Sequence, residues 1–390
     1  MKGQIRNIYP GGNTPYGFYS YYNHILPQRK AKKIFCIKGG PGVGKSTLMR
    51  KIGTHFVQKG EDVDLLWCSS DPDSLDGVVL RERGVALVDG TSPHIVDPKN
   101  PGAVDEILDL SRFWDGEKIR GNRGEIIRCN ERIGECFAVT YGYLGCAGEQ
   151  YRFLAELLDR IISPEKLLEL RAQIDMKLNG FTDLRRAENR MKREQALGTS
   201  PLPGNRKKAF AGAITPGGIK SGLDSLIGRT ERILYIRVPV GFRTEKLLRP
   251  VADRLTAAGW DIEEYYCPME PETRLEHILS ADGKLAVFCC NQYHDLSQEA
   301  LTGRKVNSLQ LSLEEEETPL EEDESRKELM QALAQIQEDS EVNLSRALTC
   351  LKRAKAWHDT LESFYIPHMD FAALDRLEHE IVGKIEEDRL

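Results

Sequence analysis

Long hydrophobic runs are missing from this chain. No stretch approaches the roughly 20 apolar residues that a membrane-spanning helix needs, and residues 1–18, MKGQIRNIYPGGNTPYGF, lack the apolar core of a secretory signal peptide. Hydrophobic residues make up 40% of the sequence and charged residues 29%, which is the balance of an ordinary globular protein. We therefore expect a cytoplasmic protein with no membrane contact.

An excess of positive charge is also missing. The chain carries 54 Lys and Arg against 60 Asp and Glu, a formal net charge of -6. Nucleic-acid-binding domains usually carry a basic patch, because neutralising phosphates supplies most of their affinity. Nucleic acid is therefore not the expected partner, although residues 112–132 form a local basic stretch.

Paired cysteines are a third absence. The nine cysteines form no CxxC pair and no Cys/His spacing typical of zinc sites, and an odd number suits reduced thiols. We interpret them as small buried hydrophobic residues.

What the sequence does contain is one internal repeat, which is the first feature to look for in a chain of 390 residues. Residues 33–89 align with residues 232–288 at a constant offset of 199. Residues 9–17 resemble residues 210–218 at an offset of 201, and the segments that start at Leu144 and Leu351 also resemble one another. Matching pairs are Gly60 and Gly259, Cys68 and Cys267, Pro72 and Pro271, and Gly84 and Gly283. We predict two tandem domains, 1–200 and 201–390.

Each half has the pattern of an α/β domain. Ile34 to Ile37 is a short apolar run ended by glycines, Thr47 to Gln58 has helical spacing, and residues 63–67 and 85–88 are two further apolar runs. Alternating strands and helices favour a parallel sheet covered by helices in three layers. Residues 103–197 and 325–388 are rich in helix-forming residues and predict helical tails.

Two segments look like linkers or loops. Residues 197–209 concentrate Gly, Pro and Ser just before the second repeat, and residues 313–325, LEEEETPLEEDES, form an acidic run. The acidic run is interpreted as a solvated loop or, alternatively, as a docking site for an unknown protein partner.

The strongest chemical signal is a glycine-rich loop between a predicted strand and a predicted helix. Residues 39–46 match the pattern GxxxxGK[ST], whose backbone N–H groups surround phosphates at the N-terminus of the following helix. Lys45 would reach the terminal phosphates of ATP, and the Ser46 hydroxyl would join the Mg2+ shell. The predicted nucleotide-binding residues are Gly39, Gly40, Pro41, Gly42, Val43, Gly44, Lys45, Ser46 and Thr47.

A second magnesium contact should stand at the end of a neighbouring strand, and Asp89 in VALVD is the candidate. No glutamate follows it, so the residue that activates water in many ATPases is missing. Asp71, after the second strand, is a candidate general base, and His94 a candidate for orienting a phosphate; both also suit structural roles in loops.

The loop GGPGVGKST, together with LVDGTSPH and CSSDPDSLDG, resembles the P-loop nucleoside triphosphatases, and in particular an uncharacterised bacterial family of tandem P-loop ATPases. The resemblance implies two tandem P-loop NTPase-like domains and ATP binding, but it brings no known reaction with it. The missing glutamate departs from the ATPase pattern.

The second repeat keeps the fold residues and loses the chemistry. A glutamate in place of Ser46 would repel a triphosphate, so we expect only the first loop to bind nucleotide. At the aligned positions, Gly39, Gly44, Lys45, Ser46 and Asp89 become Val238, Arg243, Thr244, Glu245 and Phe288.

Three functions are compatible with these patterns. The leading hypothesis is a slow Mg-dependent ATPase or nucleotide switch, in which the second domain packs on the first as a pseudo-dimer and supplies Arg237 or Arg243 to the phosphates. A small-molecule or nucleotide kinase is the alternative, with a basic lid over the transferred phosphate, and a non-hydrolysing sensor or scaffold is the third. The lid residues would be Arg112, Lys118, Arg120, Arg123, Arg128 and Arg132, which also suit a charged surface.

Overall fold

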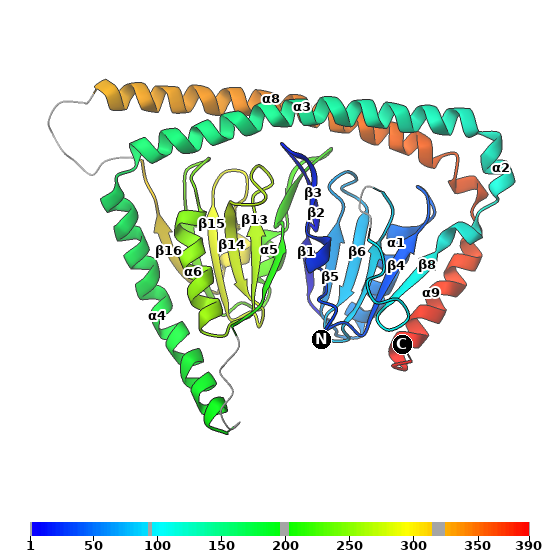
Figure 1. Cartoon of the computed structure of the whole chain (residues 1–390), viewed down its shortest axis with the longest axis horizontal. Helices are drawn as coiled ribbons and strands as arrows, with labels where there is room; N and C mark the ends of the chain where they lie inside the picture. The colour runs from blue at the N-terminus through cyan, green and yellow to red at the C-terminus, as the bar shows by residue number, and fades with distance from the viewer. Residues whose placement is uncertain (1, 93–95, 196–202, 314–323, 390) are drawn as a thin grey trace. The chain divides into compact units, whose positions relative to one another are not determined.

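The computed structural model describes residues 2–92, 96–195, 203–313 and 324–389. The predicted domain boundary at residues 200 and 201 lies outside the described residues, as do His94 and most of the acidic run. Figure 1 shows the α/β architecture of the chain.

The chain divides into two compact units, and neither is continuous in sequence. Unit 1 comprises Met1–Tyr143, Gly212–Leu226 and Ser345–Leu390, whereas unit 2 comprises Leu144–Ala211 and Ile227–Leu344. The predicted domains divide the chain only once, between residues 200 and 201. The structure differs because the C-terminal helices of each repeat pack in the unit that holds the sheet of the other repeat.

Unit 1 contains a six-stranded mixed sheet. Strand β6 runs antiparallel to both neighbours, while the other pairs are parallel. The predicted all-parallel sheet is therefore wrong: the connections on either side of β6 are too short for the crossover that parallel neighbours need. In spatial order the strands are β1 (Ile5–Ile8), β5 (Val63–Trp67), β6 (Leu75–Leu80), β7 (Val85–Asp89), β4 (Lys33–Lys38) and β8 (Asp105–Asp109).

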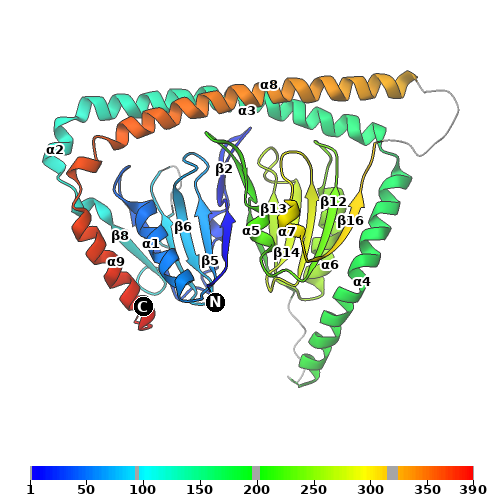
Figure 2. The ribbon, with the colours of Figure 1, turned by 180° about the vertical axis from the view of Figure 1, so that it is seen from behind.

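The core of unit 1 joins the sheet to two helices, α1 (Lys45–Gln58) and α9 (Phe371–Glu386), which Figure 2 shows beside it. Apolar residues recur every three or four positions along both helices, so each presents one continuous apolar face. The two helices lie together on one face of the sheet, which gives two of the three predicted layers. Their core residues are Leu48, Met49, Ile52, Phe56 and Val57 in α1 and Leu374, Leu377, Ile381 and Ile385 in α9.

Unit 2 repeats the topology of unit 1, and its sheet is also mixed, with β14 antiparallel to both neighbours. Helix α6 (Glu245–Ala257) corresponds to α1, and α4 (Pro164–Gln195) packs on it: Arg254 lies 3.0 Å from Asp175, and Phe181 stacks on Trp260. The strands, in order, are β9 (Arg206–Ala209), β13 (Ile262–Tyr266), β14 (Leu275–Ser280), β15 (Leu285–Cys290), β12 (Arg232–Arg237) and β16 (Lys305–Gln310).

Strand register corrects the sequence alignment of the repeats. In unit 1, Ile37 of β4 pairs with Asp89, whereas in unit 2 the equivalent Ile236 of β12 pairs with Cys289. The offset changes from 199 to 200 because the turn between β13 and β14 is one residue longer than the turn between β5 and β6. Asp89 therefore corresponds to Cys289 rather than to Phe288.

The predicted helical tails are present as long helices. The first tail contains α2 (Gly116–Gly121), α3 (Arg123–Ile161) and α4, and the second contains α8 (Glu324–Glu362) and α9. The short helices are η1 (Tyr22–His24), η2 (Leu110–Phe113), α5 (Leu223–Ile227), α7 (Gln298–Leu301) and η3 (Ile366–His368). The remaining strands form two hairpins in unit 1, β2 (Gly11–Thr14) with β3 (Gly17–Ser20), and β10 (Gly212–Thr215) with β11 (Gly218–Ser221).

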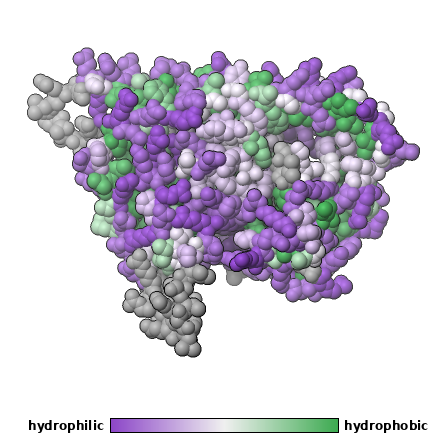
Figure 3. Space-filling model, viewed as in Figure 1, coloured by the Kyte–Doolittle hydropathy of each residue, from purple (hydrophilic) through white to green (hydrophobic). Residues whose placement is uncertain are grey.

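Among the described residues, no helix combines the length and apolar character needed to cross a bilayer. Hydrophilic residues cover most of the face shown in Figure 3, and hydrophobic residues are scattered among them.

Replacing Ile381 by Ala should lower the free energy of unfolding of unit 1 by about 2–5 kcal/mol, because it removes a fully buried side chain of α9 from the core. Chemical denaturation would measure the change. Arg376→Ala, at an exposed position of the same helix, is the matched control. Equal effects of the two substitutions would contradict the assignment of α9 to this core.

Candidate functional site

The glycine loop connects β4 to α1, as the sequence predicts. Gly42 and Gly44 have φ values of 68° and 86°, a backbone conformation that favours glycine. Gly44 is the N-cap of α1, so the free N–H groups and the positive dipole end of a 14-residue helix lie at the loop. This combination is suited to binding an anion.

Lys45 and Asp89 are brought together beside the loop. The Lys45 Nζ donates to the carbonyl oxygens of Gly39 and Gly40, both at 2.9 Å, and lies 3.4 Å from Asp89 Oδ2. Both side chains are mostly buried, with 14% and 11% of their surface exposed. Asp89 ends β7, the strand directly beside β4, which places this carboxylate at the same sheet edge as the loop.

The second oxygen of Asp89 is held by the next turn. Its Oδ1 accepts from the Thr91 backbone N–H at 2.8 Å and from the Thr91 hydroxyl. The Ser46 Oγ, in the first turn of α1, accepts from the Leu75 N–H at 2.9 Å. The Ser46 hydroxyl proton remains free to be donated elsewhere.

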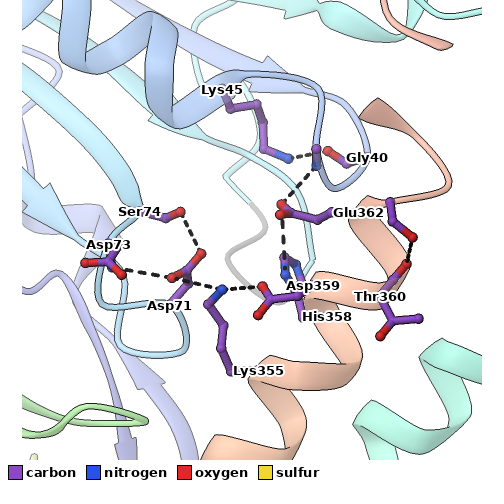
Figure 4. A network of polar contacts seen from close by, with 12 residues as sticks. Gly40, Lys45, Asp71, Asp73, Ser74, Lys355, His358, Asp359, Thr360 and Glu362 are labelled. Atoms are coloured by element: carbon purple, nitrogen blue, oxygen red, sulfur yellow. Dashed lines mark hydrogen bonds and ion pairs between the residues drawn. The ribbon is translucent and has the colours of Figure 1, made fainter. Parts of the chain in front are cut away.

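Asp71 lies in the turn between β5 and β6. Its carboxylate accepts from the Ser74 hydroxyl at 2.8 Å and lies 3.6 Å from the Nζ of Lys355, a residue of α8 (Figure 4). These contacts show a turn residue linked to α8. The proposed role of Asp71 as a general base stays a prediction.

Sequence reasoning missed the residue that contacts the loop most directly. Glu362, the last residue of α8, accepts a hydrogen bond from the Gly42 backbone N–H through Oε1 at 3.1 Å. Figure 4 shows this carboxylate pointing at the loop, with His358 on the same helix 3.9 Å away. A negatively charged group of the chain itself therefore occupies the anion-binding face of the loop.

The segment after Glu362 covers the loop closely. A Cβ added to Gly42 would lie 2.9 Å from Ile366, and one added to Gly44 would lie 2.6 Å from Leu374. Both distances are shorter than real Cβ contacts, so glycine is required for packing as well as for backbone conformation.

Two clusters of side chains in the described residues have donor atoms close enough to hold a metal ion. His358, Asp359 and Glu362 lie beside the loop and are partly exposed, whereas Glu276, His277 and His294 are more deeply buried in unit 2. The donor atoms of each cluster all lie within 4.8 Å of one another.

In unit 2, a buried arginine contacts the loop residue that corresponds to Gly42. The Arg274 guanidinium, fully buried, donates to the Gly241 carbonyl at 2.9 Å and pairs with Glu270. Burial raises the pKa of Glu245, the residue aligned with Ser46. This arrangement agrees with the predicted loss of the nucleotide site in the second repeat.

The arginines proposed to contact phosphates have partners of their own. Arg237 lies 2.6 Å from Asp295, and Arg243 lies 3.2 Å from Asp159, all within unit 2. In the basic segment, three side chains pair with acidic neighbours on or next to their own helices: Lys118 with Asp115, Arg128 with Glu125, and Arg132 with Glu135. These pairs match the charged-surface interpretation of the segment, and the lid stays a prediction.

Comparison with protein-family models, with curated proteins and with solved structures gives no match.

Replacing Gly44 by Ala should destabilise unit 1 by about 1–3 kcal/mol, because alanine is strained at positive φ and its Cβ would overlap Leu374. Gly383→Ala is the matched control: this glycine lies within α9 with open space around its Cβ position, so alanine should be neutral or stabilising. Thermal or chemical denaturation would compare them. If Gly44→Ala is as stable as Gly383→Ala, the tight packing on the loop is contradicted.

Proposed function

We propose that the chain binds ATP with Mg2+ at the loop of residues 39–44 and acts as a nucleotide-dependent switch with slow ATPase activity. The observation that carries the proposal is the Glu362 carboxylate on the Gly42 N–H. This hydrogen bond supports an anion-binding site in the loop. It also supports a switch, because an anion that bound the loop more strongly would displace Glu362 and the segment that carries it.

The loop already binds an anion, although that anion belongs to the protein. A carboxylate oxygen resembles a phosphate oxygen in charge and in its ability to accept from backbone N–H groups. Lys45 follows the loop, and its Nζ donates to the carbonyl oxygens of Gly39 and Gly40. Its positive charge therefore lies beside the loop. These residues fit a triphosphate in the P-loop manner.

Magnesium would be held by the Ser46 hydroxyl and the Asp89 carboxylate, and would neutralise charge on the phosphates. Asp89 Oδ2 is ion-paired to Lys45 in this structure. Lys45 can therefore exchange the carbonyls and the carboxylate for phosphate oxygens while Asp89 turns to the metal shell.

A triphosphate and Glu362 are mutually exclusive ligands of the loop. The Gly42 N–H has one proton to donate, and two negative groups at the same place repel each other. Nucleotide binding should therefore move Glu362 and the residues packed beside it, Ile366 and Leu374. This coupling favours a switch over an enzyme with a permanently open site.

The second repeat provides an internal comparison. The alignment of Leu144 with Leu351 gives an offset of 207, which places Ala155 opposite Glu362. A Cβ added to Gly241, the counterpart of Gly42, would lie 2.7 Å from Leu154 and 3.7 Å from the backbone nitrogen of Ala155 in unit 2. The covering helix is thus kept over both loops, but Ala155 stands where Glu362 does, and the α3 carboxylate at the degenerate loop, Asp159, pairs with Arg243 instead.

Analysis of the reaction products distinguishes the ATPase, the kinase and a sensor that binds ATP without turnover. ADP and phosphate released without an added acceptor support the ATPase, and phosphorylation of a nucleoside, nucleotide or sugar supports the kinase. Packing of the second repeat as a pseudo-dimer and docking of a protein partner stay predictions.

Replacing Lys45 by Ala should weaken ATP binding at least about tenfold, because it removes the charge that would contact the terminal phosphates. Calorimetric titration with MgATP and an assay of phosphate release would measure the effect. Lys30→Ala, an exposed lysine outside the loop, is the control. Equal ATP affinity in wild type and Lys45→Ala would overturn the proposal.

Replacing Glu362 by Gln should strengthen ATP binding by about three- to tenfold, corresponding to about 0.6–1.4 kcal/mol for a partly exposed charge. Glu362→Ala should do the same, and Glu380→Gln, on the exposed side of α9, should leave affinity unchanged. Hydrogen exchange should show residues 362–374 losing protection when MgATP binds. Unchanged or weaker affinity in both Glu362 variants would contradict the competition.

A further inference from the structure

Unit 2 contains a compact cluster of three metal-ligand side chains. Glu276 and His277 lie on β14, and His294 lies four residues beyond the end of β15. The His294 Nε2 is 3.2 Å from Glu276 Oε1, and one donor atom from each residue lies within 4.8 Å of the others. The His277 and His294 rings meet edge to face with centroids 5.1 Å apart.

The hydrogen bonding of this cluster is incomplete. His277 is only 1% exposed, yet among the described residues neither of its ring nitrogens has a hydrogen-bond partner, and the His294 Nδ1 has none either. A buried polar group without a partner is destabilising, and such groups are rare in native structures.

The contacts of His294 place its Nε2 beside a carboxylate. The His294 Nε2 lies 3.2 Å from Glu276 Oε1 and 3.0 Å from the Asn291 Nδ2, and Asn291 Oδ1 accepts from the Tyr293 N–H at 2.9 Å. An imidazole nitrogen beside a carboxylate oxygen is a donor pair that attracts a divalent cation.

The separation also has the right size. Two ligands at about 2.0–2.1 Å from a tetrahedral ion lie about 3.3 Å apart. Two imidazoles and one carboxylate suit divalent transition metals such as zinc or iron(II), whereas magnesium and calcium prefer oxygen ligands.

We propose that Glu276, His277 and His294 bind one divalent transition-metal ion, with zinc as the representative. The ion would tie β14 to the segment that follows β15 and would give a partner to one ring nitrogen of the buried His277. It would lie at the sheet edge that corresponds, in unit 1, to the edge carrying Asp89.

Comparison of the repeats supports a change of chemistry here. At the corrected offset of 200, Glu276 corresponds to Asp76, which in unit 1 accepts from the Tyr22 hydroxyl at 2.7 Å. The second repeat retains the acid, replaces Gly77 by His277, and has Leu223 at the position aligned with Tyr22. The acid thus loses a hydroxyl partner and gains an imidazole.

The experiment uses the purified full-length chain. Elemental analysis after dialysis should find about one equivalent of zinc, and chelation followed by Co2+ should give the visible absorption of a nitrogen- and oxygen-ligated cobalt site. Zinc should raise the melting temperature of the chelated protein. His277→Gln, Glu276→Gln and His294→Gln should each weaken zinc binding by at least the 10–100-fold that loss of an outer-shell partner costs.

Two controls keep the result specific. His379→Gln, an exposed histidine of α9, and Lys45→Ala, in the nucleotide loop, should both bind zinc like the wild type. Circular dichroism would confirm that the variants are folded, and the cobalt spectrum of the wild type tests the site even if a variant unfolds. Failure of the chelated wild type to take up Zn2+ or Co2+, or full binding by all three ligand variants, would overturn the proposal.

Discussion

Burial of the apolar face of α9 against α1 and the sheet of unit 1 is the constraint on which the rest of the structure depends. Helix α1 carries the loop at its N-terminus, and α9 brings with it the end of α8 and therefore Glu362. The contact of the carboxylate with the loop is a consequence of this hydrophobic packing. Unit 2 follows the same rule, since α4 packs on α6 and α3 contacts Gly241.

Each unit therefore consists of the sheet of one repeat and the helical tail of the other. The two loops are therefore covered by helices with different side chains. The loop that contains Lys45 lies beside Glu362 of the second repeat, whereas the degenerate loop lies beside Ala155 of the first repeat. The hydrogen bond between Glu362 and the Gly42 N–H is thereby linked to the packing of Ile366 and Leu374 on the loop. In the function that we propose, an anion that displaces Glu362 would also move this apolar segment.

The sequence predicts the local features of this fold well. The glycine loop, α1, the central strands, the helical tails and the internal repeat follow from short-range pattern, and the juxtaposition of Lys45 with Asp89 follows from their places at adjacent strand ends. Strand β6 was not predicted at all, and the antiparallel pairs were missed with it. The length of chain between the predicted strands 63–67 and 85–88 leaves room for a strand with short connections on both sides, which was a usable signal.

What could not be predicted depends on contacts across long separations in the chain. The pairing of Gly42 with Glu362 joins residues 320 positions apart, and nothing in the local pattern of α8 distinguishes this glutamate from its many acidic neighbours. The His277 and His294 cluster has no zinc-like spacing, and it forms only because β14 and the end of β15 meet at one sheet edge. The repeat alignment did contain one signal, because it places Glu362 opposite Ala155.

The exchange of tails has a consequence for synthesis of the chain. The strands and the helix that form the glycine loop leave the ribosome before α9, which covers their apolar face. This face of the sheet stays uncovered until about 250 further residues have been made, which takes tens of seconds at about 5–20 residues per second. The loop therefore emerges well before the Glu362 carboxylate that contacts it.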